Sequence, residues 1–123
     1  MRFIIALLLS ASIASAHEMV PTYPIWWNAT EANGILKTNL SIWNRRKDVV
    51  YYEIEVFDQN FKPADFATQE KIIKINYLQR KNFSIYIKEN DRDNVTYICT
   101  RSRLLKDDVQ TSGVSSRICS KIK

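Results

Sequence analysis

Histidine and glycine are scarce in this sequence, and each scarcity removes a class of function. The chain has one histidine, His17, in 123 residues, so a copper site built on two histidines or an H-E-x-x-H zinc site is not expected. The two glycines do not form a phosphate-binding loop. We also expect no Ser-His-Asp or Cys-His nucleophile. We therefore expect a protein that is not an enzyme, without catalytic residues, metal or cofactor.

Long apolar runs are also lacking beyond the N-terminus. Arg2 precedes a short apolar run at residues 3–9, and small residues follow at positions 14–16. This pattern is typical of a secretory signal peptide cleaved after Ala16. The run is too short for a bilayer, which needs about 20 apolar residues. We expect residues 1–16 to be a signal peptide, residues 17–123 to form one secreted or periplasmic domain, and no transmembrane segment to be present.

Helical periodicity is almost absent from the mature chain, and residues 64–71 are the only candidate for a short helical turn. Residues 35–43, 49–57 and 83–88 instead alternate apolar and polar side chains. This period of two is typical of antiparallel strands that are solvated on one face. Turn-forming residues separate the runs at intervals near ten residues. We predict an all-β fold, a single immunoglobulin-like antiparallel β-sandwich of about seven strands.

The aromatic N-terminal segment is expected at a sheet edge, because Pro21 and Pro24 cannot donate to a strand ladder. Trp26 and Trp27 are adjacent, so on a strand they point to opposite faces and only one can join the core. The other could form an aromatic contact surface with Tyr23 that stacks on sugars. Alternatively, a loop or the chain terminus covers it.

The two cysteines, Cys99 and Cys119, are expected to pair, as cysteines usually do in secreted proteins. Residues 95–105 and 114–123 are strand-like and are separated by a polar stretch, which predicts a hairpin. If the cysteines lie opposite each other, the turn centres on Val109, inside that stretch. The disulfide and the turn therefore require the same register. We expect a structural bridge that contributes roughly 3 kcal/mol.

The same register divides the hairpin into an apolar face and a cationic face. Four cations cannot be buried without partners, so we expect the cationic face to be solvated and the disulfide on it to lie at or near the surface. Arg101 opposite Arg117 would be a like-charge pair that needs a carboxylate or an anion nearby. The candidate binding surface on this face comprises Tyr97, Arg101, Arg103, Arg117 and Lys121.

Two interpretations of this surface remain open. Residues 17–73 hold six basic and eight acidic residues, whereas residues 74–123 hold eleven and five. This asymmetry permits an anionic surface or ligand as partner, although nucleic acid is not expected for a secreted protein. Alternatively, acidic residues of a neighbouring strand relieve the repulsion. Glu53 and Glu55, about 7 Å apart on one strand face, are spaced for acid/base chemistry, but such a pair is ordinary on a solvated strand.

Four N-x-S/T sequons are present, and their meaning depends on the source of the protein. In a eukaryote they would carry glycans on turns and on an outer strand face. In a bacterium or its phage they would be inert, and polar strand faces rich in Asn, Ser and Thr produce such matches unaided. The four asparagines are Asn28, Asn39, Asn82 and Asn94.

The order of several features resembles a known family. A proline-containing segment comes first, one strand ends in Asn44, the next leads into the turn 58–63, and a turn beginning at Leu78 precedes another strand. VTYICTRSRLL then follows. This order is similar to the N-terminal immunoglobulin-like domain of PapD-like periplasmic pilus chaperones, over most of the mature chain. The resemblance implies an immunoglobulin-like fold, a periplasmic location and protein binding.

The sequence also departs from that family. Those chaperones have a second domain and a basic pair that anchors the C-terminus of a subunit, and neither is expected here. Val114, Ile118 and Ile122 alternate like a strand that lends side chains to a partner, so edge-strand addition remains compatible. We expect a non-catalytic, chaperone-like or adaptor module that binds a protein partner. The alternative is a structural subunit of an extracellular assembly, such as a pilus, an envelope complex or a phage particle.

Overall fold

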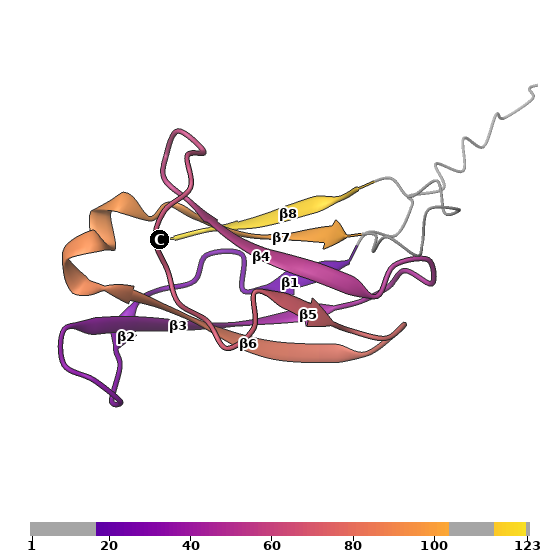
Figure 1. The fold of residues 1–123 in the computed structure, drawn as a ribbon, viewed down its shortest axis with the longest axis horizontal. Coiled ribbons are helices and arrows are strands. Elements are labelled where there is room, and N and C mark those ends of the chain that lie inside the picture. The colour runs from indigo at the N-terminus through magenta and orange to yellow at the C-terminus, as the bar shows by residue number, and fades with distance from the viewer. Residues whose placement is uncertain (1–16, 104–114, 123) are drawn as a thin grey trace, which may run out of the picture.

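The computed structural model describes residues 17–103 and 115–122, so the expected signal peptide lies outside the described residues. Within these ranges the chain forms two antiparallel sheets packed face to face (Figure 1). The elements are β1 (Glu18–Val20), β2 (Trp27–Asn28), β3 (Ile35–Trp43), β4 (Tyr51–Phe57), β5 (Ile72–Lys74), β6 (Arg80–Lys88), the 3-10 helix η1 (Glu89–Asn94), β7 (Tyr97–Arg103) and β8 (Arg117–Lys121).

The predicted all-β immunoglobulin-like sandwich is confirmed. In the first sheet, called sheet A, β3 pairs with β6 on one side and with both β1 and β2 on the other. In the second, called sheet B, the order is β5-β4-β7-β8. The described chain has eight strands rather than about seven, because the N-terminal edge strand is divided into β1 and β2.

Two prolines explain this division. β1 pairs with one end of β3 and β2 with the other, while Pro21 and Pro24 lie between them and cannot donate to a ladder. In this gap the chain turns to sheet B, where the Thr22 carbonyl accepts a hydrogen bond of 3.0 Å from the backbone N–H of Lys121. The N-terminal segment therefore forms a sheet edge, as expected, and contacts both sheets.

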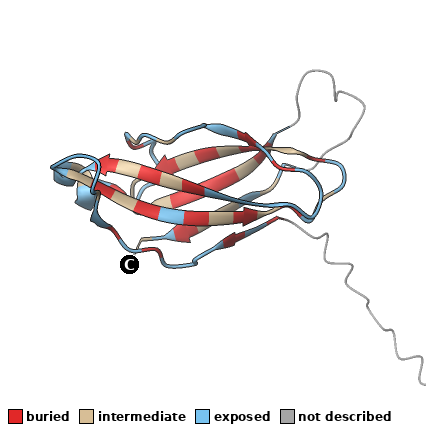
Figure 2. Ribbon diagram, turned by 90° about the horizontal axis from the view of Figure 1, so that it is seen from below, coloured by how far each residue is buried: buried red, intermediate tan, exposed pale blue. Residues whose placement is uncertain are grey.

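The core lies between the sheets, and burial alternates along the long strands (Figure 2). In β3 the even-numbered residues face inward. In β6 the buried residues are Phe83, Ile85 and Ile87. In β4 the inward face includes Tyr52, Ile54 and Val56, and in β7 it includes Ile98 and Thr100. Burial of each large apolar side chain contributes roughly 1.5–3 kcal/mol. The period-two pattern thus predicts both the strands and their buried faces.

The segment before β5 differs from expectation. Residues 64–71 do not form a helical turn. Ala67 instead exchanges two backbone hydrogen bonds, of 2.8 and 2.9 Å, with Tyr86 on the outer edge of β6. The chain then reaches β5, which pairs with the start of β4. The path of this segment is determined by its pairing with β6 and then with β4. Such long-range pairing cannot be predicted from a short window of sequence.

Candidate functional site

β7 and β8 pair in the predicted register, while the expected turn at Val109 and the predicted strand residue Val114 lie outside the described residues. Cys99 lies opposite Cys119 and forms the expected disulfide with it, with Cα atoms 4.0 Å apart. The expectation that the bridge lies at the surface is wrong for Cys99, which is fully buried. The Arg117 side chain extends across β7 to Glu55 on β4, and this ion pair lies over the same face as Cys99. A cationic face can therefore cover a cysteine when its cations are paired.

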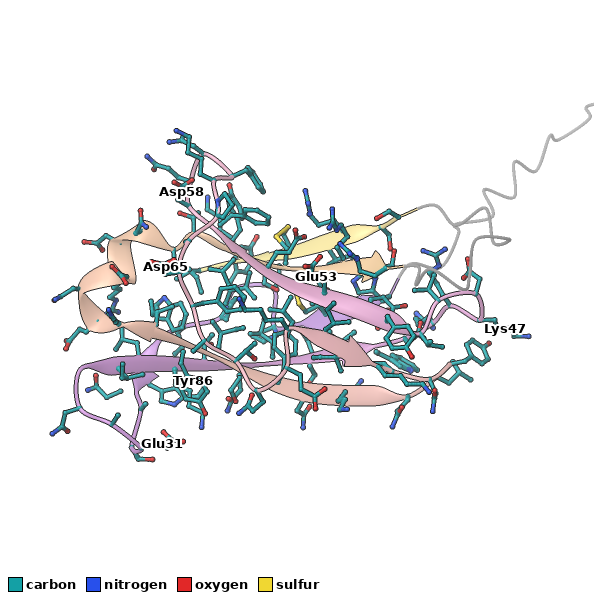
Figure 3. All side chains as sticks on the ribbon, in the orientation of Figure 1. Glu31, Lys47, Glu53, Asp58, Asp65 and Tyr86 are labelled. Carbon is teal, nitrogen blue, oxygen red and sulfur yellow. A yellow bond between two sulfur atoms is a disulfide. The ribbon has the colours of Figure 1, made fainter. Side chains whose placement is uncertain are left out.

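Two glutamates of β4 form ion pairs with the three arginines of the candidate binding surface. Arg101 and Arg103 each donate a hydrogen bond of 3.0 Å to Glu53, and Glu53 projects from β4 in Figure 3. Arg117 donates to Glu55 at 3.0 and 3.3 Å. The arginine pair across the strands is thereby relieved, as the second interpretation proposed. Both glutamates accept guanidinium hydrogen bonds, so they form ion pairs rather than an acid/base pair.

The other two residues of this surface have separate surroundings. Tyr97 is half-buried and stacks on Phe61, with ring centroids 4.3 Å apart and planes inclined by 12°. Phe61 has a φ of +58°, an uncommon conformation for a bulky residue. Lys121 is exposed at the end of β8. The five predicted residues share one face, and three of its four cations form ion pairs with Glu53 or Glu55.

The aromatic N-terminal segment is arranged as the strand geometry predicts. Trp26 is buried in the core, whereas Trp27 and Tyr23 are 41% and 63% exposed. Trp27 lies opposite Lys37, which places it on the outer face of sheet A. Within residues 17–103 and 115–122, no ring contact joins Tyr23 to Trp27. The two exposed rings therefore do not form a single stacking surface.

All four sequon asparagines are exposed, and two of them form a reciprocal pair. Asn39 on β3 lies opposite Ser84 on β6, and Ser41 lies opposite Asn82. Ser84 donates a hydrogen bond of 2.6 Å to the Asn39 side-chain oxygen. Ser41 donates in the same way to Asn82. Each serine thus bonds to the asparagine of the other sequon, so two of the four N-x-S/T matches belong to one cross-strand pairing.

His17 has a structural role that the sequence did not indicate. Its ring is buried, with Nε2 2.8 Å from the Thr100 hydroxyl oxygen and Nδ1 3.4 Å from that of Ser116. Burial lowers the His17 pKa to about 4; the Thr100 carbonyl acts in the opposite direction and the charge of Arg46 adds to the lowering. Its alternation with buried Met19 was the available signal.

The outer edge of β8 is a feature that side-chain patterns do not show. Its even-numbered residues bond to β7, because Ile122 N–H donates to Thr96 and Ser102 N–H donates to Ser116. In an antiparallel ladder, the odd-numbered residues then direct N–H and C=O groups away from β7. Lys121 confirms this alternation, since its N–H bonds to Thr22 on that outer side.

Arg117 and Cys119 are the other odd-numbered residues of β8. Within the described chain, no backbone hydrogen bond satisfies their outward N–H and C=O groups. The remaining edges are shorter or partly covered: β5 has three residues, and Ala67 pairs with part of the β6 edge. The β8 edge is itself covered at one end, where Lys121 bonds to Thr22 and where β1 contacts β8. The part of this edge that lacks a backbone partner runs from Arg117 to Cys119, on a strand that the disulfide holds in place.

The described part of the chain contains no cluster of three or more His, Cys, Asp or Glu side chains that could hold a metal. None of its helices is long and apolar enough to cross a membrane.

Comparison with known proteins gives a likeness of fold. No protein-family model matches the sequence, and no curated protein matches it significantly. Among solved structures, the crystal structure of the periplasmic chaperone SfaE is similar, with a TM-score of 0.55 and 10% sequence identity. The similarity covers 88% of this chain and 56% of that chain, so this chain spans about half the length of the chaperone. The expected resemblance to PapD-like chaperones is confirmed for the fold.

Proposed function

We propose that the protein binds a protein partner by strand addition, in which an extended segment of the partner pairs with the outer edge of β8. The unpaired backbone groups of Arg117 and Cys119 are the observation that carries this proposal. An exposed edge of this kind is a template for another strand. The role would be chaperone-like or that of an adaptor, without catalysis.

The surroundings of β8 support such a role because they fix the strand before a partner arrives. A disulfide joins its centre to β7, and the Ser120 hydroxyl donates a hydrogen bond of 2.7 Å to the Pro21 carbonyl. A template that is already ordered loses less conformational entropy on binding. Tyr23, which follows Thr22 in the chain, has an exposed side chain and offers an apolar contact to the partner.

The alternating isoleucines in and just after β8 suggested that this strand lends side chains to a partner, and the structure does not support that part of the expectation. Ile118 and Ile122 pack against the protein's own core, so they are already engaged and are not free to be lent to a partner. Recognition would therefore depend on backbone hydrogen bonds of β8 and on the side chains beside it.

An extracytoplasmic location belongs to the same proposal. The disulfide favours an oxidising compartment, and the similar solved structure is named as a periplasmic chaperone. Cleavage of a signal peptide after Ala16 stays a prediction from the sequence. We propose a secreted or periplasmic protein on these grounds.

A proline at position 117 tests the proposed edge. Proline lacks the N–H that faces the partner, but the β7 ladder does not use that N–H, so the strand is retained. The matched control is Arg117→Ala, which also loses the ion pair to Glu55 but keeps the N–H. Short peptides selected from a displayed random library against the unmodified protein are then titrated against both variants.

We expect Arg117→Pro to bind the selected peptides about tenfold or more weakly than Arg117→Ala, because a backbone hydrogen bond is lost at the centre of the interface. Equal affinities for the two variants would contradict strand addition at β8. So would a library from which no binding peptide is recovered.

A further inference from the structure

The outer face of sheet A carries a second feature that lies apart from the β8 edge. A groove of about 560 Å³ runs over β3 and β6, a volume within the range of about 300–1,000 Å³ typical of small-ligand sites. Figure 3 places Tyr86 in this layer of the sandwich and Glu53 in the other. The side chains that matter for its chemistry are Lys37, Asn39, Ser41, Gln69, Asn82 and Ser84.

The floor of the groove is a two-by-two array of amides and hydroxyls. Each serine hydroxyl donates its proton to the side-chain oxygen of the asparagine opposite, as Ser84 does to Asn39 and Ser41 to Asn82. These bonds fix the orientation of both carboxamides, with the Oδ1 atoms occupied from within. The Nδ2 groups therefore remain as donors, and the serine oxygens keep lone pairs as acceptors.

The groove has almost no net charge. Its charged side chain is Lys37, which forms an ion pair of 2.9 Å with Glu31. That hydrogen bond raises the pKa of Lys37 and lowers the pKa of Glu31, so each stays charged beside the other. A negatively charged ligand thus has no unopposed cation to meet in the groove.

Apolar surface borders this polar floor. Val20, which lies opposite Ser41, and Pro21 line one side. Trp27 lies opposite Lys37 and exposes 41% of its surface at one end of the array. The groove thus offers uncharged hydrogen-bond donors and acceptors beside an exposed indole ring. This combination suits a polyhydroxylated ligand, which has both polar groups and apolar ring faces.

We infer that this groove binds an uncharged oligosaccharide. The Asn39 and Asn82 amides donate to sugar hydroxyl or acetamido oxygens, and the Ser41 and Ser84 oxygens accept from sugar hydroxyls. Trp27 stacks on a ring that extends beyond the groove. The inference does not depend on strand addition, because no residue of β8 takes part in it.

The test uses four uncharged probes, hexa-N-acetylchitohexaose, cellohexaose, maltohexaose and mannohexaose, and heparin hexasaccharide as a charged one. Each is titrated into the isotope-labelled protein by nuclear magnetic resonance. For at least one uncharged probe we expect the side-chain amide signals of Asn39 and Asn82 to shift on binding, without any substitution in the protein.

Two double variants then provide a matched comparison. Asn39→Ala with Asn82→Ala removes the donors of the groove, whereas Asn28→Ala with Asn94→Ala removes two exposed asparagines elsewhere. We expect the first variant to bind the probe about tenfold or more weakly, since two hydrogen bonds are lost. The second variant and Arg117→Pro should bind it like the unmodified protein.

Failure of all four uncharged probes to bind would overturn the inference, as would binding of the heparin probe alone. Equal weakening by both double variants would overturn it too. Loss of peptide binding in Arg117→Pro with sugar binding intact separates this site from the proposed partner edge.

Discussion

At the scale of single residues, Asn44 links three separate parts of the chain. Its buried side-chain nitrogen donates to the carbonyls of Val49 and Ile75 at 2.7 and 2.8 Å. Its side-chain oxygen accepts from the Tyr52 hydroxyl at 2.5 Å and from the Arg46 backbone at 2.9 Å. All four hydrogen-bonding positions of one carboxamide are thus in use, and its loss would leave several buried partners unsatisfied.

We predict that Asn44→Ala lowers the free energy of unfolding by about 3–5 kcal/mol, because unsatisfied buried groups cost about 1–3 kcal/mol each. Tyr52→Phe, which removes one of the bonds, should cost about 1 kcal/mol. Urea unfolding measures both values, with the exposed Asn90→Ala as the matched control. A loss for Asn44→Ala no larger than that of the control would contradict this role.

His17 predicts a dependence of stability on pH. Its pKa falls from 6.5 in the unfolded chain to about 4 in the folded protein, so the unfolded chain takes up the proton first. The stabilisation is therefore complete above about pH 6.5 and is lost as the pH falls toward 4. We expect this loss to be on the order of 2–3 kcal/mol larger in the unmodified protein than in His17→Gln.

Unfolding by urea at a series of pH values measures this difference. The comparison with His17→Gln cancels the carboxylates that titrate in the same range. If both proteins lose the same stability between pH 6.5 and 4, His17 is not buried in its neutral form.

At the scale of strands, the charged face of sheet B depends on β4. Glu55 is 18% exposed and accepts hydrogen bonds from Arg117, with Arg101 3.9 Å away. Without its charge, the two arginines would face each other across β7 and β8 with less compensation. The cluster spans three strands, so β4 stabilises the hairpin from which it is far in sequence.

We predict that Glu55→Gln lowers the free energy of unfolding by about 1 kcal/mol at low salt, a value kept small because the partner side chains are partly exposed. Glu70→Gln, at an exposed position, is the control and should cost nearly nothing. The difference should shrink in roughly 1 M salt, where the Debye length is about 3 Å. An effect that salt leaves unchanged would indicate a cause other than charge.

The sequence predicts the long strands well and the short ones poorly. β3 was expected at its observed bounds, because nine alternating residues define one buried face unambiguously. The register of β7 and β8 was also expected, since the cysteines and the turn require the same pairing. β5, with three residues, and the bridge at Ala67 depend on distant strands and leave no local pattern.

Prediction of the candidate surfaces from the sequence is limited in the same way. The cations of β7 and β8 were placed on one face by alternation alone, but their partners Glu53 and Glu55 required knowledge of which strand lies beside β7. The β8 edge depends on backbone directions and strand order, and the groove depends on the pairing of two sequons 43 positions apart. None of these follows from a single strand.

At the scale of the whole molecule, the edge and the groove belong to different sheets of one sandwich. An immunoglobulin-like fold does not by itself specify a function, and the likeness to SfaE at 10% identity gives the fold. The assignment of roles therefore comes from the two surfaces. One offers unpaired backbone on β8, and the other offers fixed amides and hydroxyls on β3 and β6.

The open edge also raises the alternative of self-assembly. If two copies paired antiparallel through β8, centred on Cys119, Arg117 of each copy would lie opposite Lys121 of the other. This like-charge pairing is unfavourable, and charges on an edge strand commonly prevent such association. We predict a monomer by sedimentation, whereas Arg117→Glu should promote a dimer. A dimer of the unmodified protein formed through β8 would favour the structural-subunit alternative.

Amide hydrogen exchange at β8 tests the central claim most directly. The N–H groups of Arg117 and Cys119 face outward, whereas those of Ile118 and Ser120 face β7 and serve as internal controls. When a peptide selected for binding is added, strand addition predicts new protection at Arg117 and Cys119, with little change at the two controls. Unchanged exchange at Arg117 and Cys119 in the saturated complex would contradict the account.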